Sequence, residues 1–150
     1  MSDRVLREPH PKAPGLPAGI DEALIGRIVD TFYGKVRRDP VLGPIFEAAV
    51  HDWPDHLQRL RDFWSSLVLI TGRYKGSPFE AHLALPTLDA SHFAIWLRLF
   101  DQTLGELCTV EQAEVFRVRA RRVAESLQLG LAFRRGTLER DGLRRNRRKA

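Results

Sequence analysis

The sequence predicts an all-α domain, and three observations support this fold class. Apolar residues recur at helical spacing in four long segments, which end near residues 38, 72, 107 and 133. Capping residues and prolines stand where those segments begin and end. No segment alternates apolar and polar residues as a half-buried strand does. With 150 residues, 43% of them hydrophobic, the chain is long enough for one domain with a moderate core.

The first predicted helix follows Asp21, whose carboxylate suits the N-cap position, and it stops at Asp39-Pro40. A short apolar corner, residues 41–46, comes next. The apolar residues of this helix form one wide face: Leu24, Ile25, Ile28, Val29, Phe32, Tyr33 and Val36.

The second predicted helix runs from Asp52 to Gly72. Asp52 can cap it, and Pro54 is tolerated in the first turn because the missing N–H has no helical partner there. Gly72 suits its end. His56 stands four residues before Leu60, so it points toward the apolar side. The predicted buried stripe consists of Leu57, Leu60, Phe63, Trp64, Leu67 and Val68.

A short segment, residues 79–85, lies between two prolines and contains a single histidine, His82. Pro78 can begin a helix, and Pro86 prevents the helix from continuing. We therefore expect a short, stiff helix whose histidine has a fixed direction.

Two more helices complete the predicted domain. One runs from Asp89 to about Leu107. The other opens with a capping box, Thr109-x-x-Gln112, and runs to about Phe133. The apolar face of the former consists of Phe93, Trp96, Leu97, Phe100, Leu104 and Leu107.

The net charge of +5 is unevenly distributed along the chain. Residues 134–150 hold eight Lys/Arg and two acids, whereas residues 1–133 hold sixteen bases and seventeen acids. We therefore expect a flexible N-terminal arm over residues 1–19, a folded domain over 20–133 and a disordered basic tail over 134–150. Such a tail can contact phosphate groups without specificity, but we expect no dedicated nucleic-acid or membrane partner.

Several classes of protein are excluded by what the sequence lacks. The longest apolar run, residues 67–70, is too short for a membrane span, and the N-terminus has no apolar signal region, so we expect a cytoplasmic protein. The single cysteine, Cys108, rules out an internal disulfide and a cysteine metal cluster. Neither a zinc or di-iron ligand set nor a glycine-rich phosphate loop is present.

A few polar tips stand out on the aromatic faces of the predicted helices: Tyr33, His56 and Trp96, together with the lone His82. Haem needs one axial ligand, apolar walls and a few hydrogen-bond donors near the gas, and these residue types supply all three. A lone histidine or an aromatic stripe is more often plain core, however, so the pattern alone leaves both interpretations open.

Four ordered motifs bear on this choice: FYGKVRRDPVLGPIF, WPDHLQRLRDFW, YKGSPFEAHLALP and FAIWLRLF. In order and spacing, the chain resembles the third group of the truncated haemoglobins over roughly residues 20–130. The resemblance implies a two-over-two helical sandwich with a short proximal helix, and haem b (iron protoporphyrin IX) as cofactor. It implies that His82 binds the iron and that Tyr33, His56 and Trp96 face the distal pocket. The implied haem-lining residues are Phe46, Leu60, Phe63, Trp64, Leu83, Leu85 and Phe93.

The function implied is reversible binding of oxygen, or of nitric oxide or carbon monoxide, beside the Tyr/His/Trp donors. The alternative is a haem enzyme, a nitric oxide dioxygenase or a peroxidase-like protein, which would need a separate reductase because the chain has no flavin or nicotinamide domain. A third reading, without haem, is a helical interaction protein whose arginine tail meets nucleic acid.

Overall fold

The computed structural model describes residues 7–75 and 88–149, with side chains as far as Phe133. These residues form helices and no strand, so the predicted all-α class is confirmed for the part described. The helices are α2 (Glu22–Arg38), α3 (Leu42–Ala49), α4 (Trp53–Val68), α6 (Ala90–Leu107) and α7 (Val110–Lys149).

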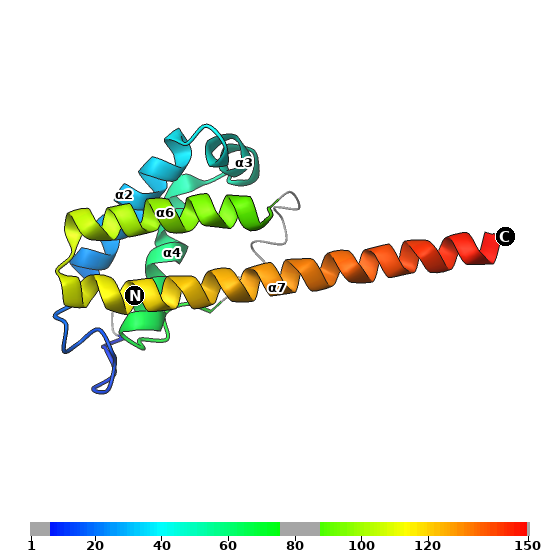
Figure 1. Cartoon of the computed structure of the whole chain (residues 1–150). Coiled ribbons are helices and arrows are strands. Elements are labelled where there is room, and N and C mark those ends of the chain that lie inside the picture. Colours follow the sequence, from blue (N-terminus) through cyan, green and yellow to red (C-terminus); the bar gives the residue numbers. More distant parts are fainter. Residues whose placement is uncertain (1–6, 76–87, 150) are drawn as a thin grey trace.

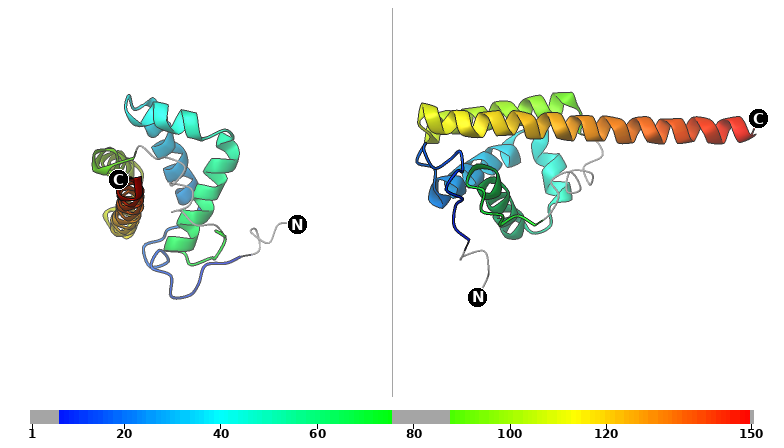
Figure 2. Two further views of the ribbon diagram at one scale, coloured as in Figure 1. Left: turned by 90° about the vertical axis from the view of Figure 1, so that its right-hand side faces the viewer. Right: turned by 90° about the horizontal axis from the view of Figure 1, so that it is seen from below.

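Two pairs of helices lie across each other. The pair α6 and α7 packs side by side, and α2 packs against both α4 and α6 (Figures 1 and 2). The short α3 contacts α2 and α6 at one end of the molecule. This is the two-over-two arrangement that the sequence analysis expected.

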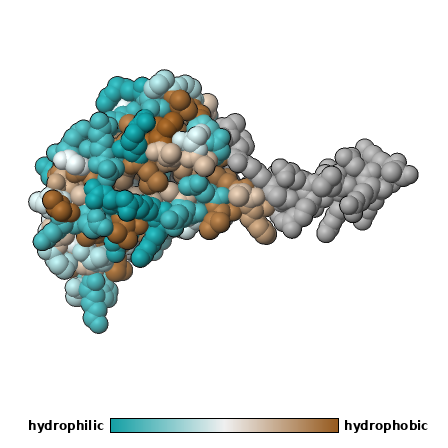
Figure 3. Space-filling view, viewed as in Figure 1, coloured by the Kyte–Doolittle hydropathy of each residue, from teal (hydrophilic) through white to brown (hydrophobic). Residues whose placement is uncertain are grey.

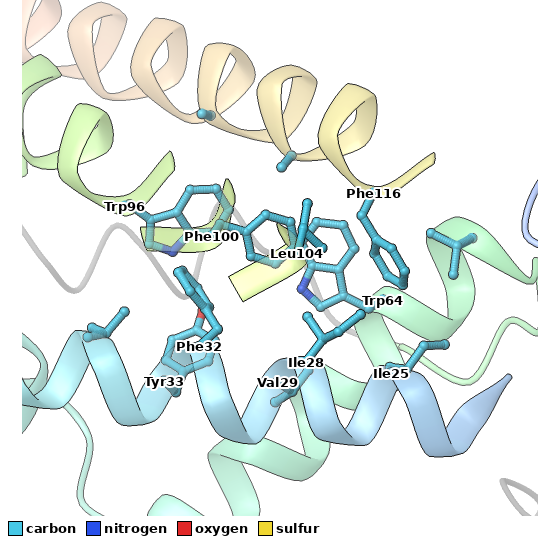
Figure 4. Packing of buried hydrophobic residues seen from close by; sticks show 14 of the residues in the cluster. Ile25, Ile28, Val29, Phe32, Tyr33, Trp64, Trp96, Phe100, Leu104 and Phe116 are labelled. Carbon is cyan, nitrogen blue, oxygen red and sulfur yellow. The ribbon is translucent and has the colours of Figure 1, made fainter. Parts of the chain in front are cut away.

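Aromatic side chains join the two pairs at the centre (Figure 4). The Phe100 ring stacks on Trp96 at 5.7 Å between centroids and on Trp64 at 5.0 Å. Phe32 of α2 meets both Trp96 and Phe100 edge-on, at 5.4 and 5.0 Å. Each such pair contributes about 0.5–1.5 kcal/mol beyond its area burial, so α2, α4 and α6 are held together largely by aromatic contacts.

The predicted caps are confirmed. The Leu24 amide donates to the Asp21 carboxylate at 2.8 Å, and the Asp55 amide donates to Asp52 at 3.1 Å. At the start of α7 the capping box forms in both directions, with Thr109 N donating to Gln112 Oε1 at 3.0 Å and Gln112 N donating to Thr109 Oγ1 at 3.2 Å.

The predicted end of the second long helix is wrong. α4 ends at Val68, four residues before Gly72, and Ile70 adopts a positive φ of 51°. The carbonyl oxygens of Val68 and Leu69 accept hydrogen bonds from Gly15 N at 2.8 Å and from His10 N at 2.9 Å. The N-terminal arm therefore satisfies carbonyls that a further helical turn would have used.

The same contacts correct the prediction of a flexible arm for residues 7–19. Ala13 is 1% exposed, and Arg7 donates through Nη1 to the Gly72 carbonyl at 2.7 Å. A Cβ on Gly15 would lie 2.7 Å from the Val68 carbonyl oxygen, closer than real Cβ contacts come. Glycine is thus required where the arm crosses the end of α4.

The last helix also differs from the prediction. α7 continues to Lys149, although the sequence analysis ended the helix near Phe133 and expected a disordered tail (Figure 1). Arg, Leu and Glu favour helix, and the two glycines in residues 134–149 each cost only about 1 kcal/mol while no proline intervenes. For all its length, α7 is too polar to cross a bilayer, and this holds for every helix in the described part of the chain.

Candidate functional site

Tyr33 lies at the junction of α2, α3 and α4 and is 2% exposed. Burial raises the pKa of its phenol far above the usual value, and the neighbouring Trp96 side chain offsets this only in part. The hydroxyl therefore stays protonated at any physiological pH and remains a hydrogen-bond donor.

Trp96, on α6, faces Tyr33 from the opposite side. Figure 4 shows its indole nitrogen and the Tyr33 oxygen turned toward each other between α2 and α6. Trp96 Nε1 is buried beside the Tyr33 hydroxyl, which it approaches closely enough to lower the phenol pKa, but among the described residues it has no acceptor in full hydrogen-bonding geometry. A buried N–H without an acceptor costs about 1–3 kcal/mol, so this donor suits a polar ligand better than a dry core.

His56 lies in the first turn of α4 and is half-buried. Its ring meets Tyr33 edge-on at 5.9 Å and an interplanar angle of 89°. The structure thus brings all three predicted distal residues together, because Tyr33 lies beside both His56 and Trp96.

An apolar pocket opens beside these donors, at the end of α6 nearest α3. Phe46 and Phe93, both predicted as haem-lining residues, line this pocket with Trp96. Phe46 also contacts the Tyr33 ring at 6.1 Å. The full lining among described residues is Leu42, Phe46, Leu88, His92, Phe93 and Trp96.

The other predicted lining residues of α4 lie elsewhere on that helix. Leu60 and Phe63 are half-buried at the edge of the core, where Phe63 contacts Tyr74 at 5.4 Å. Trp64 is 2% exposed and lies between Phe100, on which it stacks, and Phe116 of α7. These contacts place Trp64 in the core, and its contribution to the haem pocket stays a prediction.

The predicted iron ligand His82 and the predicted proximal residues Leu83 and Leu85 lie outside the described residues, so their roles stay predictions. Within residues 7–75 and 88–133, no group of three or more His, Cys, Asp or Glu side chains is arranged to hold a metal ion.

Two residues of the site were not named as site residues from the sequence: Trp53, and His92, which was expected at the surface or near the haem edge. Trp53 contacts His56 at 5.5 Å and Tyr33 at 6.5 Å. The sequence feature that could have identified it is its position three residues before His56, on the same face of the helix. His92 lines the pocket, while its Nδ1 accepts from the Asp89 amide at 3.0 Å. The sequence feature that could have identified it is its position four residues, about one helical turn, before Trp96.

The types of residue around this small pocket suit a haem group. The pocket walls are aromatic or aliphatic, as a flat apolar macrocycle requires, and the Trp96 indole N–H is a buried donor whose acceptor is not found in the described protein. The neutral Tyr33 hydroxyl adds a second donor on the same side.

Comparison with known proteins gives a consistent answer. No family model matches the chain. A curated relative, the group 3 truncated hemoglobin ctb of Campylobacter jejuni, is 35% identical over 113 residues, which are 73% of this chain and 89% of the relative.

Solved structures agree. The crystal structure of a group III truncated hemoglobin from C. jejuni superposes with a TM-score of 0.71 at 35% identity, covering 75% of this chain and 91% of that one. The 2/2 hemoglobin of Synechococcus sp. PCC 7002 superposes with a TM-score of 0.68 at 22% identity, covering 77% of this chain and 98% of that chain. The group II truncated hemoglobin of Bacillus anthracis superposes with a TM-score of 0.66 at 23% identity, covering 79% of this chain and 92% of that chain. The last two show likeness of fold alone.

Proposed function

The chain belongs to the group 3 truncated haemoglobins, a family of haem-binding globins, and from that premise we propose that it binds oxygen or another diatomic gas reversibly at haem b. The haem supplies an iron atom with one coordination position for the gas. His82 would hold the iron from the proximal side, and Tyr33, Trp96 and His56 would face the gas.

One observation carries the proposal: the buried Trp96 indole N–H, without an acceptor in the described protein, is turned toward the buried neutral hydroxyl of Tyr33. Both donors are fixed by packing before any ligand arrives, Trp96 by Phe32 and Phe100, and Tyr33 by Phe32 and Phe46. Preorganised donors in a dry pocket favour a ligand that gains negative charge when it binds, as oxygen does.

The size of this effect follows from the strength of such bonds. A hydrogen bond to a charged group contributes about 1.5–3 kcal/mol, and each 1.4 kcal/mol changes an equilibrium tenfold. Removing one donor should therefore raise the oxygen dissociation rate of the ferrous protein by about tenfold to a hundredfold.

The test measures oxygen dissociation by stopped flow in Tyr33→Phe and Trp96→Phe. Tyr74→Phe, the chain's other tyrosine, is the matched control and should leave the rate unchanged. Carbon monoxide gains less negative charge, so its dissociation should change much less. Unchanged oxygen rates in both variants would contradict the proposed donor pair.

A second candidate is enzymatic: nitric oxide and oxygen, with one electron from a separate reductase, would give nitrate, or a peroxide would be cleaved. The half-buried position of His56 favours it, because a histidine that contacts Tyr33 from the solvent side can carry protons to the pocket. Sustained nitrate formation from nitric oxide under supplied reductant, slowed in His56→Gln, would support the enzyme over the simple binder.

A further inference from the structure

We propose that Arg37 is a latch that holds the first turn of α4 closed over the distal pocket, and so sets how fast a gas ligand enters. This inference rests on the proposed function, in which the gas binds beside Tyr33 and Trp96. The latch itself consists of Arg37, Trp53 and Glu47.

One arginine joins three helices at this point. The Arg37 guanidinium, in the last turn of α2, lies 4.3 Å from the centroid of the Trp53 ring, which begins α4. Its Nε donates to Glu47 Oε1 of α3 at 2.7 Å. The flat guanidinium thus covers the outer side of Trp53 while its edge is tied to α3.

Behind Trp53 lies the distal site. Trp53 contacts His56 at 5.5 Å and Tyr33 at 6.5 Å, and His56 contacts Tyr33 at 5.9 Å. Each of these three rings contacts the other two, so they form one cluster behind the Arg37 guanidinium. A ligand that approaches from this side must displace Trp53 or His56, and Trp53 cannot move outward without leaving Arg37.

The contacts of Arg37 are suited to a closure that opens often. The side chains of Arg37 and Glu47 are 43% and 48% exposed, so water and salt compete with their ion pair. Trp53 Nε1 is buried and has no acceptor among the described residues, so opening would allow it to bond with water at no loss of a protein hydrogen bond.

The first readout is carbon monoxide association with the ferrous holoprotein, measured by flash photolysis. We expect Arg37→Gln to raise the bimolecular rate by about threefold to tenfold, the range that a partly exposed cation–π contact can supply. Arg37→Lys keeps the charge for Glu47 but not the flat stacking surface, so it should recover only part of the wild-type rate. Arg59→Gln is the matched control, because Arg59 is an arginine of α4 whose ion pair with Asp55 lies on the exposed side of the helix.

The second readout does not depend on ligand binding. Hydrogen exchange of the Trp53 indole N–H, followed by NMR in the carbon monoxide complex, should quicken in Arg37→Gln by the same factor. The Trp64 indole, packed against Phe100 and Phe116, is the internal reference and should not change.

The outcomes are distinct. Unchanged carbon monoxide association in Arg37→Gln overturns the latch, whether or not the Trp53 indole exchanges faster. Faster association with unchanged indole exchange also overturns it, because the gas would then enter by another route. The proposed donor pair is tested by a different measurement. Unchanged oxygen dissociation in Tyr33→Phe and Trp96→Phe would contradict that pair without changing what the carbon monoxide association rates say about the latch.

Discussion

At the scale of single residues, the site depends on polar groups placed where water does not reach. Tyr33 and Trp96 are both in the core, yet each keeps a donor directed between α2 and α6. Partial burial also raises the pKa of the Cys108 thiol, which disfavours the reactive thiolate. Among the buried polar groups, the Tyr33 hydroxyl and the Trp96 indole N–H lie near Phe46 and Phe93 and are suited to bind a ligand.

Tyr33 should make stability depend on alkaline pH. The phenol ionises near its ordinary pKa of 10.0 in the unfolded chain, but burial keeps it protonated in the fold. The unfolded state then binds fewer protons, so stability from this group is fully present below pH 10 and is lost as pH rises. Wild type should lose stability more steeply than Tyr33→Phe above pH 10, by up to roughly 1.4 kcal/mol per pH unit, in urea unfolding at pH 9 to 11.

Comparison with the Tyr33→Phe variant cancels the titration of lysines and of Cys108, which both proteins share. Parallel curves for wild type and Tyr33→Phe would show that the phenol ionises within the fold.

At the scale of elements, the docked arm and the end of α4 form one structural unit. The arm meets α4 where Gly15 crosses the Val68 carbonyl, and Arg73 returns the contact by donating through Nη2 to the Arg7 carbonyl at 2.7 Å. Arg73 also pairs with Glu22 at 3.2 Å, so the start of α2 is tied to the same unit.

Gly15→Ala should destabilise the fold by about 1–3 kcal/mol, because its Cβ would press on the Val68 carbonyl oxygen at 2.7 Å and backbone must shift to relieve it. Gly105→Ala in α6 is the matched control: its Cβ would meet nothing within 4 Å, and alanine favours helix by about 0.8–1 kcal/mol. Urea unfolding should therefore move the two variants in opposite directions. Equal shifts would mean that the arm contributes nothing to stability.

The starts of the helices were predictable from sequence and the end of α4 was not. Asp21, Asp52 and Thr109 cap helices through bonds to residues three positions away, so a local pattern suffices. α4 ends where it does because Gly15 supplies a donor from 53 residues upstream, and no local signal records that contact. Trp53 was missed for a similar reason, since its role depends on Arg37 and Tyr33 of another helix.

At the scale of the whole molecule, the folded body and the end of α7 differ in charge. The part of the surface nearest the viewer in Figure 3 mixes polar and apolar residues over the body. Two large apolar side chains at the outer end of the described part, Leu129 and Phe133, are 73% and 71% exposed. Beyond them the sequence is dominated by arginine.

A chain that ends at Phe133 should fold, bind haem and release oxygen at the wild-type rate, because the described residues that line the pocket beside Tyr33 end at Trp96. Its net charge falls from +5 to −1, so it should lose retention on a cation exchanger at pH 7. A full-length variant with Arg144, Arg145, Arg147 and Arg148 changed to Gln should lose much of the retention too. A Soret band that weakens on truncation would instead show that the tail supports the haem pocket.

The length of α7 has an electrical consequence. Forty residues at 1.5 Å each span about 60 Å, and residues 134–149, the last two-fifths of that length, hold a net +6, against −1 for residues 1–133. The partial negative charge at a helix C-terminus favours bases there, which helps the extension to stay helical. Charge separated over such a distance gives the molecule a large permanent dipole moment. Near any anionic surface it would orient with the C-terminus foremost. The pocket between α3 and the start of α6 lies at the end of the body from which α7 extends, so it would be turned toward that surface as well (Figure 1). The elongated outline would slow end-over-end tumbling more than spin about the α7 axis.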